Sequence, residues 1–383
     1  AWRCGDPGLQ FHSTINKWNT CKESGTINAS NPCAEYLFLD ETACNLASLN
    51  LLKFIDSKGK FHPEQLKYAS RIWTIVLEIS LAMGQFPSKE TARNTWRYRT
   101  LGLGYTGLGA ALLQLGMGYG SGKAKHWAAA ATALITAAAY HTSTEMAEAK
   151  GSFAAFEENK NSMMQVIGMH MEALDGIVPD SGNRAMLYLA SQTWQLAETG
   201  GRFYGFRNAQ VTCIAPTGTI SLLMDSETTG MEPYYSFDTR KTFSTGKQLR
   251  LDFPMAWKKL ASKTPEKVYE GKTEIRTAEE LSCIHKYADV DEEIGALFTS
   301  AMPCPICNHE GLHVNMHIDM IAAIQPFVSG GISKTVNVPH HATQKDISAC
   351  FLRAYYSGLK SISVYRDGCK AIQPLQQGDC CSI

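Results

Sequence analysis

The sequence predicts an α/β fold, because short strand-like runs alternate with longer helical patterns along the chain. Strands are expected at residues 208–215, 333–338 and 361–365. Helices are expected at residues 63–83, 125–149, 186–199, 315–324 and 346–358. With 383 residues the chain could form two or three domains, although α/β barrels of this length form one.

Each of the longer helices is expected for a local reason. The helix at 63–83 begins with Pro63, a residue favoured in the first helical turn. Its expected apolar face consists of Leu66, Ala69, Ile72, Trp73, Val76 and Ile79. The helix at 125–149 is rich in alanine, which indicates close packing against a neighbouring helix. The helix at 186–199 is expected to end at the glycine pair 200–201.

The composition is that of an ordinary globular protein, with 44% hydrophobic and 19% charged residues. Lys and Arg number 36, as do Asp and Glu, so neither a nucleic-acid-binding face nor a polybasic membrane segment is expected. The longest apolar run, within 127–140, is too short to span a bilayer. No signal peptide pattern begins the chain, so we expect a cytoplasmic protein. Because the chain opens with Ala1 rather than Met, we expect a processed or incomplete piece.

The twelve cysteines are scattered, a pattern that favours redox chemistry, metal binding or simple burial over a disulfide framework. Residues 28–50 (NASNPCAEYLFLDETACNLASLN) hold Asn31, Cys33 and Glu35 close together, with Cys44 eleven positions after Cys33. In an extended segment alternate side chains share a face, so Asn31, Cys33 and Glu35 are expected to face one substrate. The proline within the motif favours a loop over a central strand.

The residues alone leave three interpretations of this segment open. Cys33 could be a small buried hydrophobic residue, which is the usual state of a single cysteine. It could be the nucleophile of a cysteine hydrolase assisted by Glu35, although no histidine base lies within the segment. It could also act with Cys44 in redox chemistry, with a carboxylate handling a hydroxyl proton.

The string NPCAEYLFLDETACNLASLNL closely resembles the active-site finger loop of class II, adenosylcobalamin-dependent ribonucleotide reductases. The resemblance implies that Cys33 carries the thiyl radical that takes the 3′-hydrogen of the ribonucleotide. It implies that Glu35 is the base at the 3′-hydroxyl and that Asn31 hydrogen-bonds the ribose hydroxyls. Cys44 would be half of the pair that supplies reducing equivalents, after which the disulfide must be reopened by thiol exchange.

Two features favour class II over the alternative, a class I-type large subunit. The interval between Cys33 and Cys44 is short, which is similar to class II. Class I enzymes carry a tyrosine pair on the last barrel strand, whereas the matching strand here has Val364 before Tyr365. The pair at 355–356 lies on the preceding helix, where surface or packing aromatics are the simpler interpretation. The resemblance therefore implies adenosylcobalamin as the cofactor.

A second candidate site is the segment 215–221 (APTGTIS), where a strand, a turn of small residues and a helix start follow one another. Such a turn can present backbone N–H groups and hydroxyls to an anion, although an ordinary turn with a threonine cap is about as common. The string resembles the substrate phosphate-binding loop of the reductases. The implied phosphate contacts are Pro216, Thr217, Gly218, Thr219 and Ile220.

Two further motifs carry weaker signals. Residues 102–107 (GLGYTG) match the dinucleotide pattern G-x-G-x-x-G, but the acidic residue expected about twenty positions later is missing. We interpret them as a strand–helix corner in which glycines allow close packing. A zinc site is the other hypothesis, with a redox CxxC and an unpaired loop as alternatives. Its candidate ligands are Cys304, Cys307, His313 and His317.

The C-terminal tail, residues 369–383, is expected to be mobile. The resemblance implies that its cysteines reopen the active-site disulfide and are reduced by a thioredoxin-type partner. Cys380 and Cys381 are adjacent, where a disulfide is strained, so Cys369 is the alternative partner. The remaining cysteines are interpreted as buried or incidental: Cys4, Cys21, Cys213, Cys283 and Cys350.

The resemblance implies that residues 1–368 are the C-terminal part of a ten-stranded α/β barrel with a central finger loop at 28–50 and a peripheral insertion at 260–312. An N-terminal half would supply the other reducing cysteine and bind the dNTP effector. The substrate would be a ribonucleoside di- or triphosphate. The alternative function is a non-catalytic, nucleotide-binding partner of a split reductase.

Overall fold

The computed structural model describes residues 1–237, 239–242, 245–251, 253–263, 292–303, 311–370 and 375–377. Its α-helices are α1 (His12–Lys17), α2 (Pro63–Met83), α3 (Lys89–Tyr98), α4 (Leu108–Gln114), α5 (Gly122–Lys150), α6 (Phe156–Glu172), α7 (Arg184–Tyr204), α8 (Ile220–Leu223), α9 (Pro254–Lys263), α13 (Glu292–Leu297), α14 (Val314–Ile324) and α15 (Gln344–Tyr356). Its strands are β1 (Leu9–Gln10), β2 (Asn45–Asn50), β3 (Leu101–Thr106), β4 (Thr239–Thr242), β5 (Gln248–Leu251), β6 (Thr335–Val338), β7 (Ser361–Arg366) and β8 (Leu375–Gln377).

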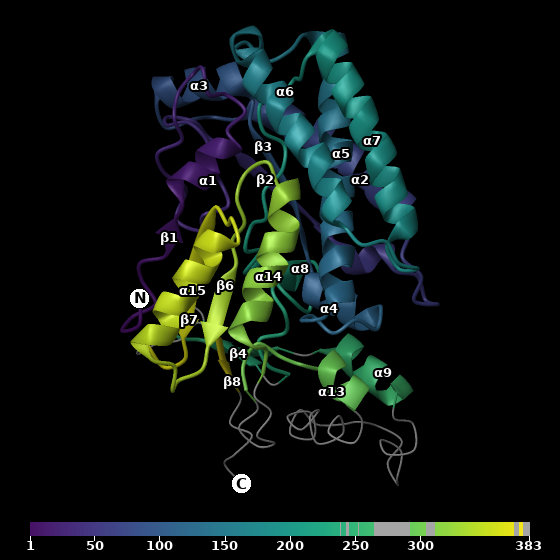
Figure 1. Cartoon of the computed structure of the whole chain (residues 1–383), viewed down its shortest axis with the longest axis vertical. Coiled ribbons are helices and arrows are strands. Elements are labelled where there is room, and N and C mark those ends of the chain that lie inside the picture. Colours follow the sequence, from purple (N-terminus) through teal and green to yellow (C-terminus); the bar gives the residue numbers. More distant parts are fainter. Residues whose placement is uncertain are drawn as a thin grey trace.

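A row of parallel strands organises the chain (Figure 1). β2 pairs with β3, and β6 pairs with β7. The extended segment 210–214 connects the two pairs, because Thr212 bridges Leu103 of β3 and Ile214 bridges Ile332 just before β6. β1 is antiparallel to β7 at the far edge. The expected α/β fold is confirmed, and within the described residues this row does not close into a barrel.

The strand expected at 208–215 forms only these single bridges, not a continuous ladder. The side chain of Ser329 explains the interruption. Its Oγ accepts hydrogen bonds from the N–H groups of Val211 and Thr212, at 3.1 and 2.9 Å. A side-chain oxygen therefore takes two donors that a neighbouring strand would otherwise use.

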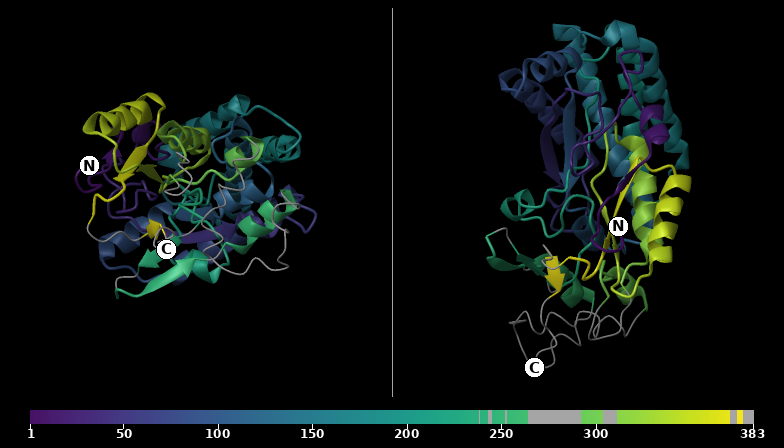
Figure 2. Two further views of the ribbon diagram at one scale, coloured as in Figure 1. Left: turned by 90° about the horizontal axis from the view of Figure 1, so that it is seen from below. Right: turned by 90° about the vertical axis from the view of Figure 1, so that its left-hand side faces the viewer.

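Helix α5 is the centre of the helical layer that covers one side of the row (Figures 1 and 2). It packs against α2, α7 and α14. Its alanines between Ala128 and Ala139 are buried. An alanine presents only a methyl group, so the neighbouring helices approach closely, and the packing expected from the alanine content is confirmed.

Helix α2 has the expected bounds, but its expected buried face is wrong. Leu66 is buried, whereas Ile72, Trp73, Val76 and Ile79 are 36%, 44%, 40% and 55% exposed. The buried residues of this helix are Leu66, Ser70, Thr74, Leu77, Glu78 and Leu81.

Polar residues can occupy the inner face of α2 because each finds a partner. Glu78 forms ion pairs with Arg99 and Arg207, at 2.5 and 2.8 Å. The hydroxyls of Ser70 and Thr74 donate to carbonyls of their own helix, at 2.8 and 2.7 Å. Satisfied buried polar groups cost little, so they can replace the apolar stripe that periodicity predicts.

Helix α7 continues beyond the glycine pair at 200–201, so the expected helix end is wrong. A Cβ atom at Gly200 would lie 2.5 Å from Thr144 Oγ1 of α5, and one at Gly201 would lie 2.4 Å from the ring of Phe206. These glycines allow close packing instead of capping the helix. The helix ends one turn later, where Gly205 has a φ of +73°.

The glycine motif at 102–107 forms strand β3 and the start of α4, so the expected strand–helix corner is confirmed. Part of the expected peripheral insertion is described as α9 and α13, whereas residues 264–291, with Cys283, lie outside the described residues. Residues 375–377 of the expected tail form β8, which pairs with β4. β4, β5 and β8 make a separate antiparallel sheet at the lower end of the molecule (Figure 2).

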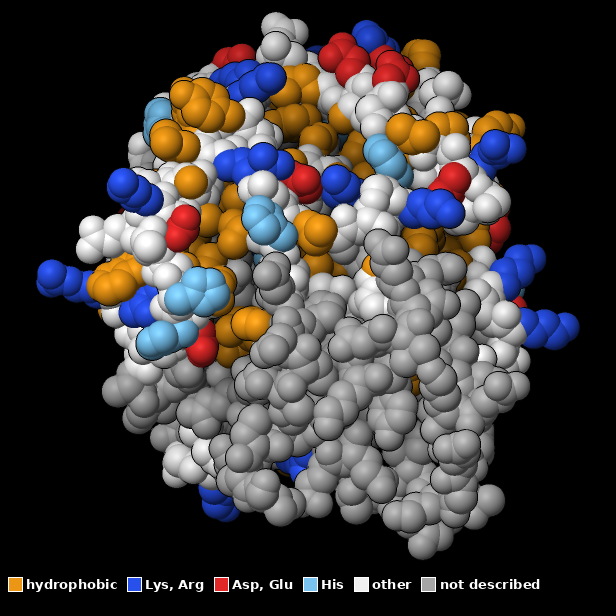
Figure 3. All heavy atoms as spheres, turned by 60° about the horizontal axis from the view of Figure 1, so that its bottom comes forward, with side chains coloured by type: hydrophobic (Ala, Val, Ile, Leu, Met, Phe, Trp, Pro, Cys, Tyr) orange, Lys and Arg blue, Asp and Glu red, His pale blue; other side chains and the backbone are white. Residues whose placement is uncertain are grey.

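Searching the described helices finds none that is both long and apolar enough to cross a membrane. On the lower face shown in Figure 3, acidic, basic and apolar side chains are interspersed over the described surface. This mixed distribution agrees with the equal numbers of acidic and basic residues in the sequence.

Replacing Gly200 by alanine should lower the free energy of unfolding by about 1–3 kcal/mol, because the new methyl group meets Thr144. Gly168 of α6 is the matched control, since a Cβ there meets no atom within 4 Å. Gly168→Ala should raise stability by about 0.5–1 kcal/mol through helix propensity alone. Thermal denaturation followed by circular dichroism measures both variants. An equal gain in both would contradict the close approach of α7 to α5.

Candidate active site

The finger loop begins with a tight turn that carries Cys33 near its tip. The Ala34 N–H donates to the Asn31 carbonyl at 3.0 Å and closes a four-residue turn. Pro32 occupies the second position of this turn, which its fixed φ favours. Asn31 Oδ1 accepts from the Tyr36 N–H at 3.0 Å. The extended geometry expected for this segment is therefore wrong, whereas the expected loop is confirmed.

Cys33 and Glu35 form a thiol–carboxylate pair with opposite exposure. Cys33 is exposed, whereas Glu35 is only 3% exposed. Within the described residues Glu35 Oε2 has no hydrogen-bond partner, although a buried carboxylate oxygen normally has one. Partial desolvation and the negative charge of Glu35 raise the pKa of the Cys33 thiol. The turn thus presents a protonated thiol near an unsatisfied buried acceptor.

Gly331 holds this turn in place through a backbone hydrogen bond. Its N–H donates to the Glu35 carbonyl at 2.7 Å, and a Cβ atom at this position would lie 2.3 Å from the Ala34 carbonyl oxygen. The segment before Gly331 is held by Lys360, whose buried Nζ donates to the carbonyls of residues 328–330. Burial lowers the pKa of Lys360 to about 7. Any side chain at Gly331 would displace the turn.

Cys44 is half-buried and lies immediately before β2. The Tyr36 hydroxyl lies 2.9 Å from Thr100 Oγ1, and Thr100 donates to the Ala43 carbonyl at 2.9 Å, which anchors this part of the loop. The structure also brings Cys213 near Cys44: Cys213 is fully buried, and a Cβ atom at Gly102 would lie 2.6 Å from Cys213 Sγ and 2.8 Å from Cys44 Sγ. The burial expected for Cys213 is confirmed, whereas its proximity to Cys44 is not expected from the sequence because no motif marks it. The available signal was its position on the segment that leads into APTGTIS.

The segment 215–221 turns sharply at Thr217, whose φ is 50°. Thr217 Oγ1 lies 2.9 Å from Thr106 Oγ1 and accepts from the Gly230 N–H at 2.6 Å. These bonds hold a backbone conformation that threonine rarely adopts. Gly218 and Thr219 are exposed, and in the described chain their N–H groups donate to no acceptor. Two backbone N–H groups at this exposed turn therefore have no acceptor in the described chain.

One glycine connects the two candidate sites. The Gly331 carbonyl accepts from the Ile214 N–H at 3.0 Å, while the Gly331 N–H donates to Glu35. Ile214 directly precedes the 215–221 segment. A short chain of backbone hydrogen bonds thus fixes the finger turn relative to the segment expected to bind phosphate.

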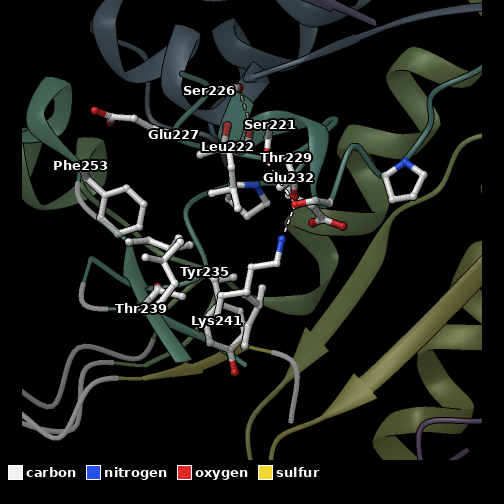
Figure 4. A pocket seen from close by; sticks show the side chains of 18 of the residues that line it. Ser221, Leu222, Ser226, Glu227, Thr229, Glu232, Tyr235, Thr239, Lys241 and Phe253 are labelled. Carbon is white, nitrogen blue, oxygen red and sulfur yellow. Dashed lines mark hydrogen bonds between the residues drawn. The ribbon is translucent and has the colours of Figure 1, made fainter. Parts of the chain in front are cut away.

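A cavity of about 760 Å³ opens beside the 215–221 segment (Figure 4). Its lining includes Gly218, Ser221, Tyr235 and Lys241. Lys241 Nζ donates to the Gly218 carbonyl, and burial lowers the pKa of this lysine. None of the four finger-loop candidates lines this cavity. The cavity therefore adjoins the 215–221 segment and is not lined by Cys33 or Cys44.

The zinc candidates are not brought together by the described residues. His317 is buried, and its Nδ1 lies 2.8 Å from Lys334 Nζ. His313 is exposed and caps α14 through its Nδ1. Cys304 and Cys307 lie outside the described residues. In the part of the chain that the structure describes, no three potential ligands are grouped to hold a metal ion.

The remaining candidates are the tyrosines of β7 and α15 and the cysteines of the C-terminal tail. Tyr365 follows Val364 on β7, and burial together with Cys369 raises the pKa of Tyr365 to about 12. The pair at 355–356 is exposed on α15, as expected for surface aromatics. Cys380 and Cys381 lie outside the described residues.

Comparison with known proteins identifies the family. Residues 1–365 match the model for the barrel domain of ribonucleotide reductase. The chain is 42% identical to the vitamin B12-dependent ribonucleotide reductase of Rhodopirellula baltica, over 98% of this chain and 36% of that relative. It is 37% identical to the vitamin B12-dependent ribonucleotide reductase of Streptomyces clavuligerus, over 98% of this chain and 39% of the relative. The chain belongs to the ribonucleotide reductase barrel-domain family, and it spans less than half the length of these relatives.

The Glu35→Gln variant should raise the alkylation rate of Cys33 by iodoacetamide severalfold at about pH 8, below the ordinary thiol pKa. Removing the negative charge lowers the Cys33 pKa, so more of the reactive thiolate is present. Mass spectrometry of the digested protein measures the rate at this residue. Glu41→Gln is the matched control on the same loop and should leave the rate unchanged. Equal rates in the wild type and Glu35→Gln would contradict the charge interaction.

Proposed function

We propose that this chain carries the radical-bearing part of a ribonucleotide reductase active site, and that the complete enzyme reduces ribonucleotides to 2′-deoxyribonucleotides with adenosylcobalamin. The observation that carries the proposal is the turn that exposes Cys33 near the buried, unpartnered carboxylate of Glu35. A thiol that exchanges a hydrogen atom with a substrate must be exposed. A carboxylate that accepts a proton needs a free oxygen. The vitamin B12 dependence named for the relatives supports the same function.

Three residues of the turn each have a separate role at the ribose. Cys33, as a thiyl radical, takes the 3′-hydrogen atom and returns it at the end of the cycle. Glu35 Oε2 accepts the proton of the 3′-hydroxyl. The Oδ1 of Asn31 is already bonded to the Tyr36 N–H, so its Nδ2 is the group that donates to a ribose hydroxyl.

Cys44 supplies one of the two thiols that reduce the 2′-position. The 2′-hydroxyl leaves as water, and the two thiols become a disulfide. A thioredoxin-type reductant then restores the thiols by exchange through the tail cysteines Cys380, Cys381 and Cys369.

The 215–221 segment binds the phosphates of a ribonucleoside di- or triphosphate. The free N–H groups of Gly218 and Thr219 and the hydroxyl of Thr219 are donors to phosphate oxygens. Lys241 adds a cation on the same side, because its Nζ already contacts Gly218. The adjoining cavity provides room for the nucleotide.

The surroundings of Cys33 fit adenosylcobalamin in one respect. The thiol is exposed at a turn tip, so a group that removes its hydrogen atom can reach it from outside the chain. Strand β7 carries Tyr365 beside Val364 and therefore lacks the tyrosine pair of a long-range relay. When bound, adenosylcobalamin supplies the radical that starts the chemistry. Cys33 is the residue on which that radical acts.

An N-terminal half of the enzyme completes a ten-stranded barrel. In the described chain the outer edge of β2 pairs with no strand, which leaves its backbone groups open to another strand. Beside it, α2 exposes an apolar stripe with helical spacing, formed by Tyr68, Ile72, Val76, Ile79 and Met83. An unpaired edge beside an exposed apolar stripe favours a further segment covering both. This half would also bind the dNTP effector.

In the complete enzyme, Cys33→Ser should reduce deoxyribonucleotide formation to background, because serine cannot form a comparable radical. The electron paramagnetic resonance signal of a cobalt(II)–thiyl pair should be lost as well. Cys350→Ser, a buried cysteine on α15, is the control and should retain activity. Unchanged turnover in Cys33→Ala would instead indicate a non-catalytic nucleotide-binding subunit. The isolated chain should form no product.

Ile79→Asp on α2 should weaken assembly with the N-terminal half at least tenfold, because a charge would be buried against an apolar partner. The folded state of this chain should be unaffected, since Ile79 is exposed. Analytical ultracentrifugation of the mixed halves measures assembly. Gln65→Glu, an exposed polar position on the same helix, is the control. If both variants assemble alike, the stripe is not the interface.

A further inference from the structure

Tyr36 contacts both parts of the finger loop that carry thiols, and its backbone makes the first of these contacts. Its N–H donates to Asn31 Oδ1 at 3.0 Å, and its carbonyl accepts from the Asn31 N–H at 3.3 Å. The Asn31 carbonyl in turn accepts from the Ala34 N–H and closes the turn that carries Cys33. The backbone of Tyr36 is therefore bonded directly to the Cys33 turn.

The side chain of Tyr36 reaches the segment that leads into Cys44. Its hydroxyl lies 2.8 Å from Thr42 Oγ1 and 2.9 Å from Thr100 Oγ1. Thr100 Oγ1 donates to the Ala43 carbonyl at 2.9 Å, and this carbonyl belongs to the peptide bond that joins Ala43 to Cys44. The Tyr36 hydroxyl is thus connected to the Cys44 backbone through one intervening threonine.

The direction of these hydrogen bonds follows from the number of protons. Thr42 and Thr100 each donate the hydroxyl proton to a main-chain carbonyl of the finger loop. A threonine hydroxyl has one proton, so towards Tyr36 both threonine oxygens are acceptors. Burial and the charge of a Cys44 thiolate raise the pKa of Tyr36 well above its ordinary value. The tyrosine therefore keeps the proton that it donates to the two threonines.

We propose that Tyr36 is a positioning residue of the active site, and that its hydroxyl fixes Cys44 relative to the turn that carries Cys33. This proposal rests on the proposed function, in which Cys33 takes the 3′-hydrogen and Cys44 reduces the 2′-position of the same ribose. Two groups that act on neighbouring carbon atoms need a constant separation. Tyr36 maintains this separation because its backbone is bonded to one thiol-bearing segment and its side chain to the other.

The contacts around Ala43 indicate that loss of the hydroxyl loosens this segment without unfolding it. The Ala43 N–H donates to Thr95 Oγ1 at 3.0 Å, whereas its carbonyl accepts from Thr100. Of these two threonines, Thr100 is the one bonded to Tyr36. The bond to Thr95 is retained when the hydroxyl is removed, so the effect should be confined to the neighbourhood of Cys44.

Alkylation kinetics of the 383-residue chain test the proposal without requiring turnover. After iodoacetamide labelling, trypsin and a Glu-specific protease place Cys33 in peptide 24–35 and Cys44 in peptide 42–53. In Tyr36→Phe the rate at Cys44 should rise severalfold, because local opening exposes this half-buried thiol. The rate at Cys33 should stay unchanged, because phenylalanine retains the backbone hydrogen bonds of the turn.

Tyr105→Phe is the matched control. The Tyr105 hydroxyl lies 3.0 Å from Thr132 Oγ1, so this variant also loses a buried tyrosine–threonine hydrogen bond. Tyr105 pairs with Leu49 at the opposite end of the β2–β3 ladder from Cys44. Both alkylation rates should therefore equal those of the wild type.

Variants of Thr100 show whether the hydrogen-bond chain carries the effect, and they keep the test valid if Tyr36→Phe does not fold. Thr100→Val should raise the rate at Cys44, whereas Thr100→Ser, which keeps the hydroxyl, should not. The double variant Tyr36→Phe/Thr100→Val should react like Thr100→Val alone, because both changes interrupt the same chain. Circular dichroism confirms that each protein is folded.

The complete enzyme separates the two steps at the ribose. In Tyr36→Phe the cobalt(II)–thiyl signal, which depends on Cys33, should be retained in the electron paramagnetic resonance spectrum. Deoxyribonucleotide formation should fall by roughly tenfold or more, because Cys44 is displaced from the 2′-position. Loss of the signal together with the product would contradict a role confined to Cys44.

Equal rates at Cys44 in the wild type and Tyr36→Phe would overturn the proposal. So would a parallel rise at Cys33 and Cys44, which would show general loosening of the loop. Failure of the proposed function is separate, because it appears as unchanged turnover in Cys33→Ala. The labelling rates do not depend on turnover, so the two failures are distinguishable.

Discussion

The arrangement of the site depends on one backbone contact, the hydrogen bond from the Gly331 N–H to the Glu35 carbonyl. The contact exists because Gly331 has no side chain, and a Cβ atom there would lie 2.3 Å from the Ala34 carbonyl oxygen. The Gly331 carbonyl in turn accepts from Ile214. A single residue therefore holds the thiol-bearing turn and the start of the 215–221 segment at a fixed separation, as the proposed reaction on a substrate bound through its phosphates would require.

Buried charged side chains stabilise this arrangement. The Nζ of Lys360 is buried and donates to the carbonyls of residues 328–330, immediately before Gly331. In the helical layer, Glu78 pairs with Arg99 and Arg207. Such groups are costly to bury unless their partners are in place, so they favour one arrangement of the surrounding segments. The ends of the parallel strands are consequently held by polar contacts as well as by apolar packing.

Local sequence patterns predicted where the helices and strands lie more accurately than which of their faces are buried. The bounds of α2 and the approximate positions of α14, α15 and β7 follow from periodicity and end signals. The buried face of α2 does not follow from periodicity, because the partners of Glu78, Ser70 and Thr74 come from tertiary contacts and from helix geometry. The end of α7 was missed for a related reason. Thr144 of α5 lies against Gly200 and leaves no room for a side chain there. In the sequence, a glycine required for such packing cannot be distinguished from one that caps a helix.

The sequence by itself determined the α/β class, the family resemblance and the candidate residues of the finger loop, because these are properties of contiguous strings. Only the tertiary structure decided how these residues meet. It closed the loop into a turn that exposes Cys33 and buries Glu35, and it brought Cys213 across β3 to Cys44. The physical reason is that both outcomes depend on glycines whose empty side-chain space is filled from distant parts of the chain. Gly331 and Gly102 are ordinary glycines in the sequence, and their role appears only when the strands lie side by side.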